Sequence, residues 1–164
     1  MNAIALIPAR GGSKGILRKN IKLFNSKPLI YWSIQAALNC NYIDRVIVST
    51  DDEEIAEIAK SFSAEVPFLR PKELATDSSP SIDAVIHALE NVPNVKDILL
   101  LQPTSPLRET KHIEEIFKLR SKFNSDSAVS ITLSKKHVDL FFKINSKKEI
   151  YPHNNNFKAL PRQK

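Results

Sequence analysis

Short apolar runs alternate along the chain with segments whose apolar residues recur at helical spacing. Five runs predict strands, at residues 3–7, 45–49, 65–69, 97–101 and 127–133. Four intervening segments predict helices, at residues 29–38, 50–62, 79–89 and 110–117. Because strands that alternate with helices form parallel sheets, we expect an α/β fold with a mostly parallel sheet covered by helices on both faces.

Two of the predicted helices carry signals for their starts and their buried faces. Thr50 and Glu53 have capping-box spacing ahead of the second helix. The third helix begins after Ser79 and Pro80. We expect it to bury the apolar face formed by Ile82, Val85, Ile86 and Leu89.

The pattern changes after residue 133. Two short apolar pieces, 140–144 and 149–151, predict a hairpin that projects from the sheet, and the final residues have no periodic pattern. We therefore expect a nucleotide-binding core over residues 1–133 and a hairpin with a basic tail over residues 134–164.

Charge is distributed unevenly, and this argues against a nucleic-acid partner. The net charge is +6, yet residues 1–43 hold six cations and no acid, while the middle of the chain is acidic and the tail basic. Such blocks favour local anion sites over one continuous nucleic-acid footprint. No apolar run approaches the ~20 residues that span a bilayer, so we expect a soluble, cytoplasmic protein without a membrane partner.

All three glycines, Gly11, Gly12 and Gly15, lie within five residues directly after the first predicted strand. Cations are interleaved with them, and a glycine-rich turn at the carboxyl end of a strand lets backbone N–H groups approach a phosphate. The loop from Pro8 to Asn20 is thus a candidate phosphate-binding loop. Its letters match neither the P-loop nor the dinucleotide fingerprint, so another nucleotide family is required.

The segment IPARGGSKGILRKNIK resembles the signature of the CMP-sialic acid synthetases, also called acylneuraminate cytidylyltransferases. Three later segments agree with that family in content and order: VSTDDEEIA at 48–56, LRPKELATDSSPSIDAVIHAL at 69–89 and LLQPTSPLR at 100–108. The resemblance implies a Rossmann-like nucleotidyltransferase. The implied reaction transfers CMP from CTP to an acidic nonulosonate sugar of the N-acylneuraminate type and releases pyrophosphate.

The resemblance also assigns site residues. The positions that match nucleotide contacts are Arg10, Gly11, Gly12, Ser13, Lys14, Lys19, Asn20, Arg70 and Ser81. Of these, Arg10 and Lys19 match the catalytic positions, and Gln102, expected at the end of a buried strand, matches a residue that faces the sugar. Asp51 is a further candidate, although capping of the following helix also explains it. Arg18 lies where the family pattern varies, so we expect a solvated surface charge.

The resemblance further implies a homodimer in which the hairpin presents Arg162 and Gln163 across the interface. It implies Mg²⁺ as cofactor, held by an aspartate pair in a C-terminal segment that follows an R-x-N-G stretch. The chain reaches Lys164 before that segment, so we expect a C-terminally truncated family member. The alternative sugars are legionaminate, pseudaminate and 3-deoxy-manno-octulosonate. The alternative of another class is a non-catalytic CTP-binding dimerisation module.

Overall fold

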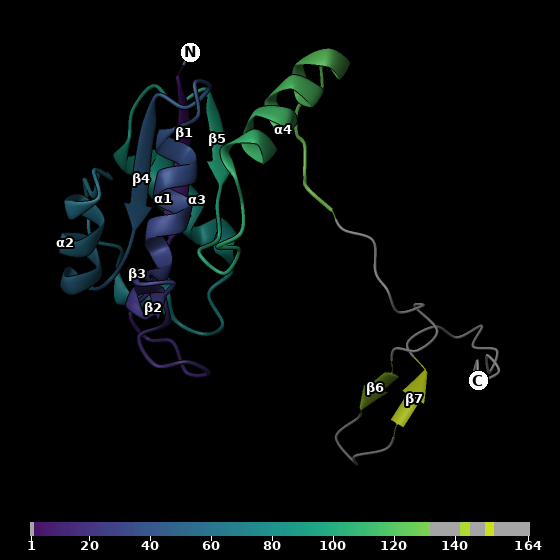
Figure 1. Cartoon of the computed structure of the whole chain (residues 1–164). Coiled ribbons are helices and arrows are strands. Elements are labelled where there is room, and N and C mark those ends of the chain that lie inside the picture. Colours follow the sequence, from purple (N-terminus) through teal and green to yellow (C-terminus); the bar gives the residue numbers. More distant parts are fainter. Residues whose placement is uncertain (1, 132–141, 145–149, 153–164) are drawn as a thin grey trace. The chain divides into compact units, whose positions relative to one another are not determined.

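Three parallel strands form the sheet at the centre of the fold (Figure 1). β1 (Ala3–Pro8) lies between β4 (Arg45–Ser49) and β5 (Asp97–Leu100), and Leu6 is in register with Ile47 on one side and Leu100 on the other. This computed structural model describes residues 2–131, 142–144 and 150–152. The chain forms two compact units, residues 1–128 and 129–164.

Helices connect the strands and cover both faces of the sheet, as the alternating pattern predicts. They are α1 (Leu29–Leu38), α2 (Glu53–Ser61), α3 (Ser81–Asn91) and α4 (Thr110–Phe123). Successive side chains of β1 point to opposite faces, so Ala5 and Ile7 join the core that includes residues of α1 and α2, while Ile4 and Leu6 join the core that includes residues of α3.

The strand order places a switch point beside β1. After β1 the chain crosses through α1 to β4 on one side, and it later returns through α3 to β5 on the other side. Connections that leave in opposite directions open a crevice outside the carboxyl ends of the strands, where open α/β sheets bind ligands. The glycine-containing loop follows β1 directly, so the fold brings it to this crevice.

α1 and β4 have the bounds that the sequence predicts, but the predicted capping box at Thr50 and Glu53 is wrong. Asp52 is the N-cap of α2, and its Oδ1 accepts a hydrogen bond from the backbone N–H of Ile55 at 3.0 Å. Thr50 is fully buried at the end of β4, and its Oγ1 accepts from the backbone N–H of Asp52 instead. The helix consequently starts two residues later than a cap at Thr50 requires.

The predicted buried face of α3 is also wrong, although the helix itself is present. Ala84 and Ala88 are buried against the sheet with Val92, and Val85 packs beside them. Small side chains let the helix lie close to the strands, which turns the larger residues outward. The predicted face is therefore largely exposed, at Ile82 (56%), Ile86 (49%) and Leu89 (44%).

Three strand predictions need correction. The segment at 65–69 contributes a single parallel bridge from Glu65 to Ile47, because Pro67 has no N–H to continue the pairing. β5 is half-buried rather than buried, since among the described residues no strand pairs with its outer edge, and Leu100 is 37% exposed. Residues 127–131 form no strand and make no ladder with any described strand, while residues 132 and 133 lie outside the described part.

Two short antiparallel ribbons and two short 3-10 helices, η1 (Lys19–Ile21) and η2 (Lys72–Ala75), are also present among the described residues. β2 (Leu23–Phe24) pairs with β3 (Lys27–Pro28) around a turn with positive φ at Asn25 and Ser26. In the second unit β6 (Phe142–Ile144) pairs with β7 (Ile150–Pro152), which confirms the predicted hairpin in these residues. Its role in dimerisation stays a prediction. Among the helices described, none combines the length and the apolarity needed to cross a membrane.

Candidate nucleotide site

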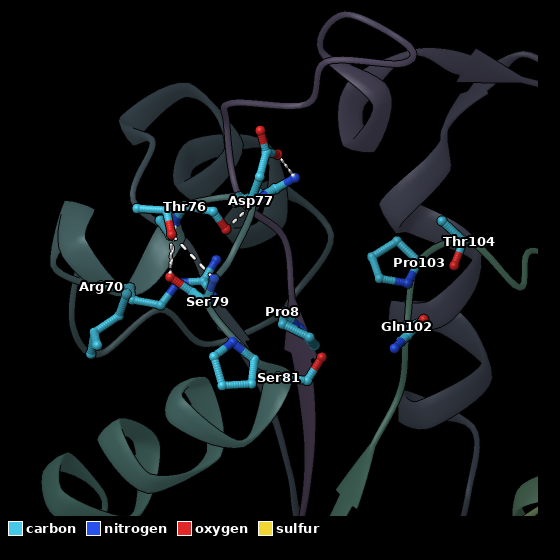
Figure 2. A pocket seen from close by; sticks show the side chains of 13 residues that line it. Pro8, Arg70, Thr76, Asp77, Ser79, Ser81, Gln102, Pro103 and Thr104 are labelled. Atoms are coloured by element: carbon cyan, nitrogen blue, oxygen red, sulfur yellow. Dashed lines mark hydrogen bonds and ion pairs between the residues drawn. The ribbon is translucent and has the colours of Figure 1, made fainter. Parts of the chain in front are cut away.

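A pocket of about 220 Å³ lies at the carboxyl edge of the sheet. Its lining comes from the end of β1 with Arg10, from the segment between Arg70 and Ser81, and from residues 102–104 after β5. Figure 2 shows Thr76, Asp77 and Ser79 on one side of this pocket and Gln102, Pro103 and Thr104 on the other. The pocket therefore joins three of the segments that carry the family resemblance.

The loop after β1 is organised by buried polar side chains. Asn20, on the short 3-10 helix η1 (Lys19–Ile21), is 3% exposed, and its Nδ2 donates to the carbonyl oxygen of Arg10 at 2.9 Å. Ser13 is also buried, at 6% exposed, and its backbone N–H donates to the carbonyl of Gly11. Asn20 thus holds the backbone at Arg10.

Gly11 fits where a larger residue does not. Its backbone N–H donates to Oδ1 of Asp51 at 2.9 Å, and a Cβ placed on it would lie 2.6 Å from Oδ2 of Asp52. At Gly12 and Gly15 an added Cβ meets nothing within 4 Å. Close approach of the start of α2 therefore explains Gly11, and Asp51 fixes the loop instead of capping the helix.

Arg70 is a buried cation at the pocket wall. It is 7% exposed, its backbone N–H donates to the carbonyl of Thr50 at 2.7 Å, and its Nε has no hydrogen-bond partner among the described residues. Burial lowers the pKa of Arg70, the carboxylate of Asp51 raises it, and the positive charge of Arg10 lowers it further. Two guanidinium groups thus repel each other at one pocket, an arrangement that an anion would stabilise.

Arg10 and Lys14 converge on Asp77, a residue that the sequence did not single out. The Arg10 guanidinium donates to the backbone carbonyl of Thr76 and to Oδ1 of Asp77, while Lys14 Nζ lies 2.5 Å from Oδ2 of Asp77. The hydrogen bond from Lys14, with a smaller contribution from Arg10, holds the pKa of the Asp77 carboxyl below its ordinary value. Asp77 lies more than 60 positions after both cations in the sequence, so only the fold brings it to them.

Arg18 is not the solvated charge that we expected. Its guanidinium bonds to both carboxylate oxygens of Asp52 and to Glu54, and its side chain is 33% exposed. Arg18 adopts a left-handed backbone conformation with φ of 54° immediately before η1. The next residue, Lys19, is half-buried and takes part in no ion pair among the described residues.

Ser81 and Gln102 line the pocket from α3 and from the carboxyl end of β5. Gln102 is exposed and lies beyond the end of β5 at Leu100, so the expectation that it ends a buried strand is wrong. It nevertheless lines the pocket at this edge of the sheet. Its backbone carbonyl lies 3.4 Å from Nη1 of Arg108, which also lies 3.5 Å from Oγ of Ser33. Arg108, whose pKa burial lowers, thereby supports the turn that presents Gln102.

The described residues contain neither the predicted cross-dimer residues nor a cluster of metal ligands. Arg162 and Gln163 lie outside the described residues. In the described ranges no three His, Cys, Asp or Glu side chains gather as metal ligands. The carboxylate of Asp77, which lines the pocket, binds Arg10 and Lys14, while Asp51 and Asp52 bind Gly11 and Arg18. The described residues alone therefore do not fit a metal site.

Known proteins resemble this chain in sequence. A family model described as "Cytidylyltransferase" matches residues 4–164. The N-acylneuraminate cytidylyltransferase of Escherichia coli O18:K1:H7 is 44% identical over 81% of this chain and 32% of its own length. The CMP-N,N'-diacetyllegionaminic acid synthase of Legionella pneumophila is 42% identical over 80% of this chain and 58% of its own length. The matched region thus spans about a third of the first relative and somewhat more than half of the second.

A solved structure has the same fold. CMP:2-keto-3-deoxy-manno-octonic acid synthetase complexed with CTP matches with a TM-score of 0.66, covering 74% of this chain and 48% of that chain at 21% identity. The likeness agrees with a Rossmann-like nucleotidyltransferase fold, as the sequence predicts.

Proposed function

The chain belongs to the cytidylyltransferase family, and we propose that it transfers CMP from CTP to an acidic nonulosonate sugar of the N-acylneuraminate type. Pyrophosphate is the leaving group. The observation that carries the proposal is the convergence of Arg10 and Arg70 on a pocket at the strand switch point, with Gln102 on its opposite side. Cations and polar groups at that position suit a polyphosphate and a second, polar substrate.

In this proposal the loop after β1 holds the triphosphate. Arg10, Ser13 and Lys14 contact its oxygens, while Gly12 leaves room for the backbone to approach them. Lys19 neutralises the charge that develops on the α-phosphate as the anomeric hydroxyl of the sugar attacks it. Such transfer depends mainly on positioning and charge neutralisation, which a rigid cationic loop supplies.

The nucleoside and the sugar take opposite sides of the pocket. Arg70 and Ser81 contact the ribose and cytosine, and Gln102 faces the sugar. Asn20 and Asp51 act on the loop itself, because Asn20 holds the Arg10 carbonyl and Asp51 accepts from the Gly11 N–H. Gly11 takes part through its tight fit against α2.

We also propose a cytoplasmic homodimer that uses Mg²⁺, as the family resemblance implies. The metal would neutralise phosphate charge during transfer. The described residues contain no cluster of ligands for it. For the dimer, the hairpin would pack on a second subunit and deliver Arg162 and Gln163 to that subunit's loop. Sedimentation velocity tests this: deletion after Leu133 should abolish the dimer, and a monomer in both forms contradicts the proposal.

The direct test is product formation. The protein is incubated with CTP, Mg²⁺ and, separately, N-acetylneuraminate, legionaminate, pseudaminate and 3-deoxy-manno-octulosonate, and each CMP-sugar is detected by mass spectrometry. We expect most product with N-acetylneuraminate. More product with another sugar would reassign the acceptor. Thermal stabilisation by CTP without any product would instead favour a non-catalytic CTP-binding module.

Base recognition is tested separately by thermal unfolding with the four nucleoside triphosphates. We expect CTP to stabilise the fold by about 2.7 kcal/mol at a hundredfold excess over Kd, and ATP to stabilise it much less. Equal stabilisation by all four nucleotides would remove the cytidine assignment, because the phosphates are common to all of them.

A further inference from the structure

Asp77 occupies the position between two cations of the phosphate loop. One of its carboxylate oxygens binds the Arg10 guanidinium and the other binds the Lys14 ammonium. Each oxygen therefore satisfies a different cation, as two oxygens of one phosphate group would. The carboxylate is an internal anion on the side chains that the proposed function gives to the triphosphate.

The segment that carries Asp77 is held in place by its own hydrogen bonds. Thr76 and Ser79 bond to each other through their hydroxyl oxygens at 2.7 Å, and Ser79 Oγ donates to the carbonyl of Glu73 at 3.0 Å. The backbone N–H of each of Thr76 and Ser79 also donates to the other's hydroxyl. This network forms one wall of the pocket and presents Asp77 to the loop (Figure 2).

Both partners remain accessible to a competing anion. The side chain of Asp77 is 41% exposed and that of Lys14 is 84% exposed, so water already reaches the contact. Exposed ion pairs are weak and are screened by salt, whereas a triphosphate brings several charges and many more acceptor oxygens. A polyphosphate can thus displace the carboxylate, but it must compete with it.

We propose that Asp77 sets the affinity of the site for polyphosphate by competing with it for Arg10 and Lys14. The inference rests on the proposed function, because it takes these two cations as triphosphate ligands. Asp77 weakens the binding of every ligand whose phosphates contact Arg10 and Lys14, and it binds these cations again when the phosphates leave. It therefore sets the affinity for CTP and promotes the release of pyrophosphate.

The test is the binding of inorganic tripolyphosphate, a probe without base or sugar, by titration calorimetry at fixed ionic strength. Asp77→Asn keeps the shape of the side chain and removes its charge. We expect this variant to bind tripolyphosphate roughly three- to tenfold more tightly than the unaltered chain. Asp126→Asn, which makes the same change in net charge after α4, is the matched control and should change affinity less than about twofold.

Equal or weaker binding by Asp77→Asn overturns the inference, since Asp77 would then position the cations rather than compete for them. Absence of tripolyphosphate binding in every form overturns it as well. Asp77→Ser, which also removes the charge, should reproduce the gain and provides a second variant if Asp77→Asn folds poorly. The ratio of CTP to ATP affinity, measured in the same variants, reports on base recognition. If no form of the protein prefers CTP to ATP, but Asp77→Asn still binds tripolyphosphate more tightly, the result counts against the proposed function and not against this inference.

Discussion

A Cβ atom on Gly11 would lie 2.6 Å from Oδ2 of Asp52, the residue that caps α2. The loop after β1 and the start of α2 therefore pack so closely at this point that only glycine fits without a shift of Asp52. Since Asp52 also binds Arg18, any shift of its carboxylate disturbs a second contact between the same two segments.

Gly11→Ala should lower the free energy of unfolding by about 1–3 kcal/mol, because the added methyl group forces Asp52 away. Gly12→Ala is the matched control: a Cβ there meets nothing within 4 Å, and the backbone does not have positive φ. It should be neutral or stabilise by up to about 1 kcal/mol. Urea denaturation of both variants makes the comparison, and equal effects would show that the approach of Asp52 does not constrain Gly11.

Lys19→Ala should lower kcat by about 100-fold and change the affinity for CTP far less. A charge that acts chiefly at the reacting phosphate is felt in the transition state more than in the bound substrate. Steady-state kinetics with CTP measures the split, and Lys22→Ala, at an exposed neighbouring lysine, serves as the control. An unchanged kcat with a raised KM would make Lys19 an ordinary binding residue.

Arg70→Met should remove stabilisation by CTP while leaving the ligand-free fold as stable as before, or more stable by about 1 kcal/mol. The reason is that the buried guanidinium has an unpartnered Nε in the described structure, and its burial disfavours its charge. Thermal unfolding with and without CTP measures both effects. A loss of about 3–5 kcal/mol in the absence of CTP would instead mean that attraction between Arg70 and Asp51 stabilises the fold.

Asp52 should make folding stability depend on pH in the acid range. The Arg18 guanidinium holds the pKa of Asp52 below its ordinary value near 3.8, against the opposing effect of burial. A carboxyl with a lowered pKa in the folded state contributes stability that is complete above its ordinary pKa and is lost as the pH falls through the folded value. This contribution should be about 1 kcal/mol at neutral pH.

Asp52→Asn tests this contribution, because asparagine also caps helices well and only the charge is removed. Urea denaturation from about pH 7 to pH 2 should show a deficit in the variant that shrinks toward the acid end. Asp126→Asn controls for the general effect of losing one acid. A deficit that stays constant with pH would assign the effect to the cap and not to the ion pair with Arg18.

Local periodicity in the sequence was enough to predict most of the elements. α1 and β4 have the predicted bounds because an apolar run, or a helical repeat after a proline, constrains the backbone over the residues that carry it. The clustered glycines and cations likewise placed the candidate loop directly after the first strand. The site residues that line the pocket, Arg10, Arg70, Ser81 and Gln102, all lie in segments that the family resemblance had marked.

The tertiary structure decided what depends on partners distant in sequence. Which face of α3 is buried depends on how closely its alanines allow the helix to approach the sheet. A periodic pattern alone does not predict that Ala88 is buried and Ile86 exposed. A strand needs a neighbour, so the apolar residues at 127–131 do not form one by composition alone. The contacts of Arg18 with Asp52 and of Arg10 with Asp77 join residues 34 and 67 positions apart, and only the folded chain brings their charges together.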